Sequence, residues 1–237
     1  MANTAGHQNG WVKMDTGIRT GRIVGVLSLL LVVCGILTNF VLTAPLFGEP
    51  GFLINAAGHS SQIGLSALVG VAMGLVSIGV GVVLYPIFRQ HSQTVGLFYY
   101  ALVIAGFALT VVENINVMSM LSLSQAYVKA GVAQREMYEG LRIVVSSARN
   151  WTHYMSLIVS GCTLFVFYMA MFRFALIPRL ISVFGLLAVC LHLIAVSMPL
   201  FGHDVDFRLI MPLGICEIIL SLWLIARGFR GKAIAQT

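Results

Sequence analysis

The sequence predicts an all-α fold, a polytopic membrane protein built as a bundle of six transmembrane helices. Three observations favour this fold class. Hydrophobic residues make up 59% of the 237 residues, and the mean hydropathy is +0.95. Charged residues make up 9%, whereas soluble globular domains carry about 25%, which excludes a soluble protein. The apolar residues gather in six stretches, each long enough to cross about 30 Å of hydrocarbon.

These stretches define one transmembrane domain, expected over residues 23–228. The first stretch is not expected to be a cleaved signal peptide, because a polar segment precedes it and its apolar run exceeds the core of a signal. Residues 1–22 and 229–237 are expected to form the two tails. The stretches cover residues 23–44, 63–88, 95–121, 151–172, 180–199 and 209–226.

Basic residues between the stretches predict how the chain crosses the membrane. Nine fall on one side and five on the other, and most of the five lie in one long connection whose charges count for less. Both termini are therefore expected in the cytoplasm. Basic residues at helix ends meet the headgroups of membrane lipids, so the net charge of +6 does not point to nucleic acid as a partner.

The long connection, residues 122–150, is predicted to be helical and to lie on the outer side. Its apolar residues, among them Tyr127, Val128 and Val132, recur at intervals of three and four between polar residues. This pattern is typical of an amphipathic helix lying on the membrane surface, or of a helical extension of the third and fourth stretches. Such a segment either packs on the surface or covers a cavity as a lid.

Small residues line one face of the second stretch. Gly70 and Gly74 form a small-xxx-small pair, which lets two helix backbones approach closely. The partner of this face is either another helix of the same chain or a second subunit. A homo-oligomer or a complex with another membrane protein through the Gly70/Gly74 face is therefore one expectation.

Four ionisable residues lie inside the apolar stretches: Glu113, His153, His192 and Glu217. An ionisable side chain in hydrocarbon costs free energy, and such residues usually pair with one another or mark a functional site. We therefore predict these four as catalytic residues. The alternative interpretation is structural, with the carboxylates bonded to polar groups of neighbouring helices and holding the bundle together.

Polar residues accompany these four at comparable depth, between the membrane midplane and the outer headgroups. The rise of 1.5 Å per residue converts position along a helix into depth, and it places Asn39 in the same outer layer. Three pairs of polar residues are spaced three or four apart and so share a helix face. We expect a polar pocket whose ligand-binding residues are Asn39, Asn116, Asn150 and Ser221.

The chemistry of such a pocket remains open at the level of the sequence. The leading hypothesis is binding, with or without acid–base conversion, of a small or lipid-like amphipathic molecule. Proton-coupled transport and a non-catalytic structural subunit are the alternatives, so the sequence does not decide whether the protein is an enzyme. No metal or cofactor is predicted. Zinc or iron held by two histidines and two carboxylates, or haem between His153 and His192, are weaker alternatives, because no short-range ligand motif is present.

Segments distributed along most of the chain resemble a bacterial family of six-span proteins, catalogued as domain of unknown function 4386. The similar segments are Gly21-Arg22-Ile23-Val24-Gly25-Val26-Leu27, Leu84-Tyr85-Pro86-Ile87-Phe88-Arg89, His153-Tyr154, Ile177-Pro178-Arg179 and Glu217-Ile218-Ile219-Leu220-Ser221-Leu222-Trp223-Leu224-Ile225-Ala226-Arg227-Gly228. The resemblance implies six helices and a multi-pass location in a bacterial inner membrane. It implies no activity.

The resemblance also bears on single residues. His153 and Glu217 match positions where family members carry a histidine and an acid, whereas His192 and Glu113 have no such match. Members often carry an arginine followed by a polar residue early in the third span, where this chain has Val103 and Gly106. Either Glu113 compensates further along the same span, or this chain lacks the family's activity.

Overall fold

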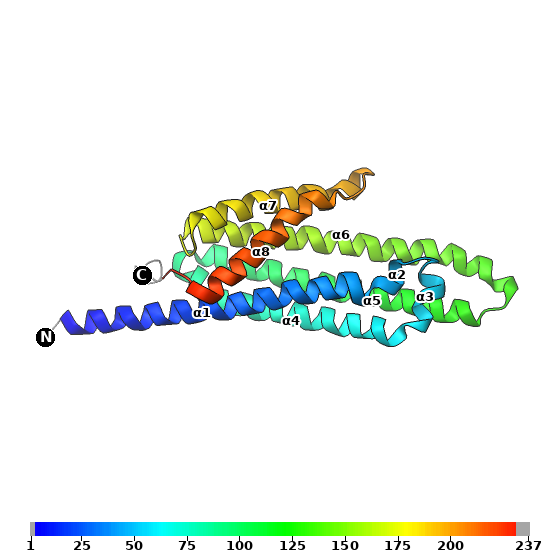
Figure 1. Cartoon of the computed structure of the whole chain (residues 1–237), viewed down its shortest axis with the longest axis horizontal. Helices are drawn as coiled ribbons and strands as arrows, with labels where there is room; N and C mark the ends of the chain where they lie inside the picture. The colour runs from blue at the N-terminus through cyan, green and yellow to red at the C-terminus, as the bar shows by residue number, and fades with distance from the viewer. Residues whose placement is uncertain (1–2, 231–237) are drawn as a thin grey trace. The chain divides into compact units, whose positions relative to one another are not determined.

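The computed structural model describes the backbone of residues 3–230 and the side chains of residues 17–230 (Figure 1). This part of the chain is mostly helical and contains no β-strand, which confirms the all-α fold. Six helices are long and apolar enough to cross a membrane, so the six predicted spans are confirmed as well. They belong to α1 (Asn3–Leu37), α4 (Ser60–His91), α5 (Gln93–Lys129), α6 (Arg135–Arg173), α7 (Arg179–Ser197) and α8 (Phe207–Arg227).

Residues 1–22 and 229–237 are the two predicted tails. Helix α1 already begins at Asn3, so the segment predicted as the N-terminal tail is helical, and its apolar span begins at Gly17. Most of the predicted C-terminal tail, residues 231–237, lies outside the described residues. Phe229 is buried, and the backbone N–H of Arg230 donates to the Leu176 carbonyl over 2.9 Å.

The connection predicted over residues 122–150 is a helical extension of both neighbouring spans. Helix α5 continues to Lys129 and α6 begins at Arg135. The turn between them contains a short 3-10 helix, η2 (Val132–Gln134). The second of the two expected arrangements is therefore confirmed, and the connecting turn itself is short.

The chain folds into two compact units. The first contains Met1–Val32, Val76–Ile104 and Ile158–Thr237, and the second contains Val33–Leu75 and Ala105–Leu157. The boundaries fall within α1, α4, α5 and α6, so these helices supply residues to both units. Each unit has its own hydrophobic core.

Aromatic residues meet within the otherwise aliphatic core of the first unit. Phe88 and Tyr99 meet edge to face with ring centroids 5.2 Å apart, and Tyr168 is fully buried. Helices α7 and α8 run antiparallel and pack against each other (Figure 1). Asp206 caps α8 by accepting the Arg208 N–H over 3.0 Å, and its hydrogen bonds to Arg208 hold the pKa of the Asp206 carboxyl below its usual range.

Glycines allow α1 and α8 to touch in this unit. A Cβ atom added to Gly25 would lie 2.8 Å from the Ser221 carbonyl oxygen and 2.9 Å from the Ile225 nitrogen. A Cβ at Gly21 would collide with the backbone of Gly228 and Phe229. Only glycine fits where two backbones approach so closely.

The core of the second unit forms around two short helices, α2 (Ala44–Phe47) and α3 (Phe52–Gly58), which lie side by side (Figure 1). The Ser124 hydroxyl of α5 joins α3 to the longer helices, since it accepts the Ala57 N–H over 2.9 Å and donates to the Leu53 carbonyl over 2.9 Å. A π-helical turn, η1 (Thr38–Leu42), precedes α2. Such turns often occur near functional sites.

The Gly70/Gly74 face packs against α5 in the second unit. A Cβ at Gly70 would lie 2.8 Å from the Asn114 side-chain nitrogen, and one at Gly74 would collide with the Phe107 ring. Of the two expected partners of this face, the structure therefore shows the helix of the same chain. An oligomer remains a prediction.

Candidate functional site

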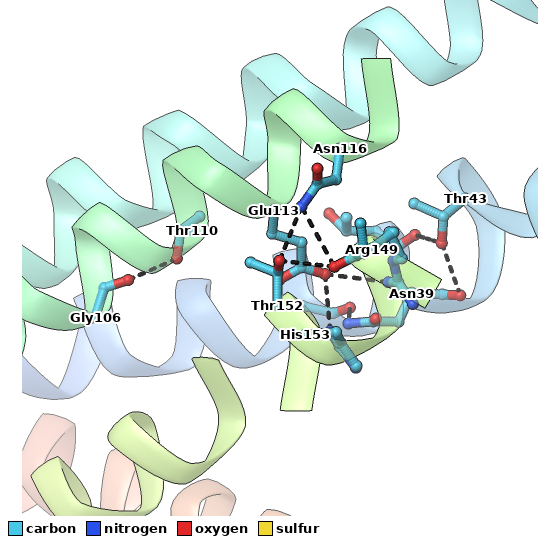
Figure 2. A network of polar contacts seen from close by, with 12 residues as sticks. Asn39, Thr43, Gly106, Thr110, Glu113, Asn116, Arg149, Thr152 and His153 are labelled. Carbon is cyan, nitrogen blue, oxygen red and sulfur yellow. Dashed lines mark hydrogen bonds and ion pairs between the residues drawn. The ribbon is translucent and has the colours of Figure 1, made fainter. Parts of the chain in front are cut away.

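Three charged or ionisable side chains meet in the second unit, two on α6 and one on α5 (Figure 2). The Nη2 of Arg149 donates to Glu113 Oε1 over 3.1 Å. The Nδ1 of His153 lies 2.8 Å from the same Glu113 oxygen. Arg149 and His153 are four residues apart, which places them on one face of α6. We refer to Glu113, Arg149 and His153 as the charged cluster.

The cluster is poorly exposed. The side chains of Arg149, Glu113 and His153 are 8%, 18% and 24% exposed, respectively. Arginine keeps its charge in proteins, so an ionised Glu113 makes the cluster neutral while His153 is neutral. Protonation of His153 gives the cluster a net charge of +1. Mutual pairing explains how these groups are accommodated within candidate membrane spans.

Arg149 also contacts an aromatic ring. Its guanidinium carbon lies 4.6 Å from the ring centroid of Phe47 on α2, a cation–π contact. Its Nε is buried and has no hydrogen-bond partner among the described residues. An arginine has five N–H donors, so the contact with Glu113 leaves most of them available.

A neutral polar contact lies next to the cluster and joins the same two helices. The Asn116 amide of α5 donates to the Thr152 hydroxyl over 2.8 Å, and the Thr152 hydroxyl donates to the Ala148 carbonyl over 2.8 Å (Figure 2). The polar face expected on α5 from the spacing of Glu113 and Asn116 is thus present. It faces α6.

The other predicted ligand-binding residues of this unit do not join the cluster by hydrogen bonds. The Asn39 amide, in η1, donates to the Gly35 carbonyl of α1 over 2.9 Å. Asn150 is exposed, and no hydrogen bond of its side chain is described. The spacing of Asn150 and His153 predicted that both would line one site. In the structure Arg149, not Asn150, contacts Glu113 together with His153.

The remaining predicted residues belong to the first unit. His192 is 6% exposed, and a Cβ at Gly161 would lie 3.2 Å from its ring. Glu217 on α8 is half-buried and interacts electrostatically with Tyr168 and Cys216; within residues 17–230 its carboxylate has no hydrogen bond or ion pair. Ser221 is fully buried. A common pocket for all four ionisable residues remains a prediction.

Residues 23–228 match the family model described as Domain of unknown function (DUF4386). The chain belongs to this family. No curated protein and no solved structure matches the chain. The resemblance found in the sequence is confirmed, and the function must be argued from the site.

The structure explains the glycines in two of the segments that resemble the DUF4386 family. The first segment contains Gly21 and Gly25, and the last segment ends with Gly228. In the structure these glycines lie where α1 and α8 touch. Packing therefore explains these positions, and they are not candidates for chemistry.

Sequence reasoning missed Arg149 in this member of the DUF4386 family. Arg149 falls in the predicted outer connection, residues 122–150, where the sequence indicates only a basic residue that bears on orientation. Its spacing of four from His153 was the signal that could have found it, because α6 begins at Arg135 and includes both residues. Asn114 was missed as well; its amide donates to the Ala67 carbonyl of α4 over 3.2 Å.

A groove with a volume of about 700 Å³ lies in the second unit. It is open and mainly apolar, and it follows the face of α5 that carries Asn114, Ile115 and Met118. No residue of the charged cluster lines it. The groove is therefore not the predicted polar pocket. Among the described residues, no group of three or more His, Cys, Asp or Glu side chains is placed to hold a metal ion.

Proposed function

We propose that this membrane protein binds a small, amphipathic or lipid-like molecule at the charged cluster, and that His153 accepts a proton from it. The observation that supports this most directly is the 2.8 Å contact between Glu113 Oε1 and His153 Nδ1. A carboxylate–histidine pair within membrane-spanning helices is expensive to maintain and is typical of proton transfer.

The geometry gives each group a role. An ionised carboxylate can only accept a hydrogen bond, so Glu113 holds the His153 proton on Nδ1. The lone pair of a neutral His153 is then on Nε2, at the opposite side of the ring. Figure 2 shows the His153 ring extending away from the network. Nε2 is thus the atom that accepts a proton from a bound molecule, and Glu113 orients the ring.

The amphipathic character of the ligand follows from the surroundings. Apolar residues predominate in both helices, and the exposed side chains near this end of the second unit include Phe47, which is 53% exposed. A molecule that reaches the cluster meets apolar side chains around a small number of polar groups. Ligand sites with this composition bind molecules that are largely apolar and carry one polar group.

Purification of matched variants tests the proposal. The wild-type protein, His153→Ala and Glu113→Gln are purified in mild detergent, and the small molecules that remain bound are extracted and identified by mass spectrometry. His59→Ala is the control, because His59 is exposed and its Nδ1 lies 2.8 Å from the Asn55 carbonyl oxygen, in its own segment.

We expect a molecule that is retained by the wild type and by His59→Ala. The amount of this molecule retained should fall about tenfold in His153→Ala and in Glu113→Gln. A tenfold fall corresponds to a loss of about 1.4 kcal/mol of binding free energy. Equal retention by all folded variants would contradict the proposal. The cluster would then serve to join α5 to α6.

A further inference from the structure

We infer that the ligand of the charged cluster carries an oxyanion, a carboxylate or a phosphate, which binds Arg149 beside His153. This inference rests on the proposed function and specifies the chemical class of its ligand. It depends on the unused hydrogen-bond donors of Arg149, on the arrangement of Glu113 and on the charge of the cluster.

Arg149 is bound to Glu113 at one point. A guanidinium and a carboxylate can form two parallel hydrogen bonds, one to each oxygen. Here both Arg149 Nη2 and His153 Nδ1 use the same oxygen, Glu113 Oε1. The fork geometry of the guanidinium, which fits carboxylates and phosphates, is therefore not fully used by Glu113.

The unpartnered Nε of Arg149 is the second observation. The side chain is 8% exposed, and Nε is buried with no hydrogen-bond partner among the described residues. A buried donor without a partner carries a free-energy cost. A second acceptor group at this guanidinium would remove that cost. An oxyanion supplies such an acceptor, and a neutral apolar molecule does not.

The charge of the cluster favours the same class of ligand. His153 faces Glu113 of α5 and Arg149 of its own helix, with Tyr154 beside it. When a bound acid loses its proton, the O–H bond breaks and an N–H bond forms at His153 Nε2. The product is an oxyanion next to two cations, Arg149 and the protonated His153, with Glu113 as their other counter-charge. The ligand anion thus neutralises the +1 charge that the proton creates.

Access to Arg149 requires movement of Phe47. The ring stacks on the guanidinium, but Phe47 is 53% exposed and lies at the end of the four-residue helix α2. A rotation of this side chain would expose the face of the guanidinium that the ring covers. The apolar part of the ligand then takes the place of the ring.

Native mass spectrometry and calorimetry test the inference on the full-length protein. The probes are phosphatidylglycerol, oleate and inorganic phosphate, with diacylglycerol as the control lipid, because it carries no oxyanion. The variant is Arg149→Gln. The matched control is Arg142→Gln, which removes an exposed arginine of the same helix that is paired with Glu139 over 3.1 Å.

We expect at least one anionic probe to bind the wild type and Arg142→Gln, and to bind Arg149→Gln about tenfold more weakly. If phosphatidylglycerol or oleate binds and inorganic phosphate does not, the oxyanion belongs to a lipid. If only inorganic phosphate binds, the oxyanion belongs to a soluble ligand. If Arg149→Gln does not fold, Arg149→Lys keeps the charge and loses the planar fork, and we expect weaker binding there as well.

Equal binding of the anionic probes by the wild type and both arginine variants would overturn the inference. Binding of diacylglycerol as tight as that of the anionic lipids would overturn it as well. The proposed function fails separately, when retention of the extracted molecule does not depend on His153 or Glu113. A molecule that depends on His153 but contains no oxyanion would leave the proposed function standing and refute this inference.

Discussion

Glu113 Oε1 accepts from Arg149 and lies within hydrogen-bond distance of His153, so one oxygen atom is shared by the three residues of the cluster. Such a shared atom makes the residues energetically dependent on one another. Removing one partner leaves a charge without compensation in a poorly hydrated place, which costs more than the intact pair contributes.

The first prediction measures this dependence. In a double-mutant cycle with Glu113→Gln and Arg149→Gln, we expect a coupling of about 2 kcal/mol in the free energy of unfolding, because both side chains are largely buried. The measurement is unfolding of the purified protein in detergent micelles with increasing denaturant.

The control cycle uses Glu139→Gln and Arg142→Gln on α6, whose side chains are 48% and 50% exposed. Exposed pairs contribute little, so a coupling of about 0.3 kcal/mol is expected there. Similar couplings in the two cycles would show that the Glu113–Arg149 contact is as weak as a surface ion pair.

The second prediction concerns the tautomer of His153. Because the carboxylate of Glu113 accepts from Nδ1, the neutral ring should carry its proton on Nδ1. Nitrogen NMR of the histidine-labelled protein distinguishes the two ring nitrogens, and His153→Ala assigns the signal. We expect Glu113→Gln to shift the population away from this tautomer; a His153 spectrum unchanged by this substitution would contradict the hydrogen bond.

At the residue scale, the sequence was informative about ionisable groups and less so about their partners. The cost of charge in hydrocarbon singled out Glu113 and His153, and the structure brings these two together. Arg149 was not recognised, because a positive charge near the end of a span looks like an orientation signal. Partner choice depends on helix rotation, which hydropathy does not specify.

At the scale of the element, close helix contact depends on single glycines. The backbone atoms that a Cβ of Gly25 would meet belong to a packed helix and cannot rotate away as a side chain can. The contact between α1 and α8 therefore tolerates no added atom at this position. A third prediction follows from this geometry.

We expect Gly25→Ala to lower the free energy of unfolding by about 2 kcal/mol, a typical cost of overpacking. Gly214→Ala is the matched control, since Gly214 lies inside α8 and a Cβ there would meet nothing within 4 Å. That substitution should stabilise the helix by about 0.5–1 kcal/mol through propensity alone. A loss of stability in both variants would contradict the prediction, because the effect of the added Cβ would then not depend on the space around the glycine.

The extension of α5 and α6 shows what periodicity can and cannot predict about an element. Spacings of three and four in residues 122–150 indicated a helix correctly. They did not indicate whether that helix lies on the membrane surface or continues the spans, because both arrangements leave one face polar. The burial of Tyr127 and Val145 against the core of the second unit is a tertiary contact, and it accompanies the continued helices.

At the scale of the whole molecule, hydropathy predicted the number and order of the spans because crossing hydrocarbon imposes a minimum apolar length. It did not predict the two compact units, whose boundaries fall inside continuous helices. These boundaries follow from which side chains pack together. Hydropathy also did not predict that the four predicted catalytic residues belong to different units. Glu113 and His153 lie in the second unit, and His192 and Glu217 lie in the first.

The fourth prediction concerns how the whole chain crosses the membrane. Six spans are an even number, so both termini must lie on one side, and the distribution of basic residues predicts that this is the cytoplasm. A variant without Cys34, Cys162, Cys190 and Cys216 provides a background for single cysteines. The added substitutions are Gln90→Cys, Gly131→Cys and Asp204→Cys, all at exposed positions.

A membrane-impermeant maleimide added to intact cells should label Gly131→Cys and Asp204→Cys, because both turns are expected outside. Gln90→Cys, in the last turn of α4, should be labelled only after the membrane is permeabilised. Labelling of all three in intact cells would indicate leaky membranes or a segment that does not span. The reverse pattern would place the charged cluster near the cytoplasmic face, and the molecule it binds would then have to reach it from inside the cell.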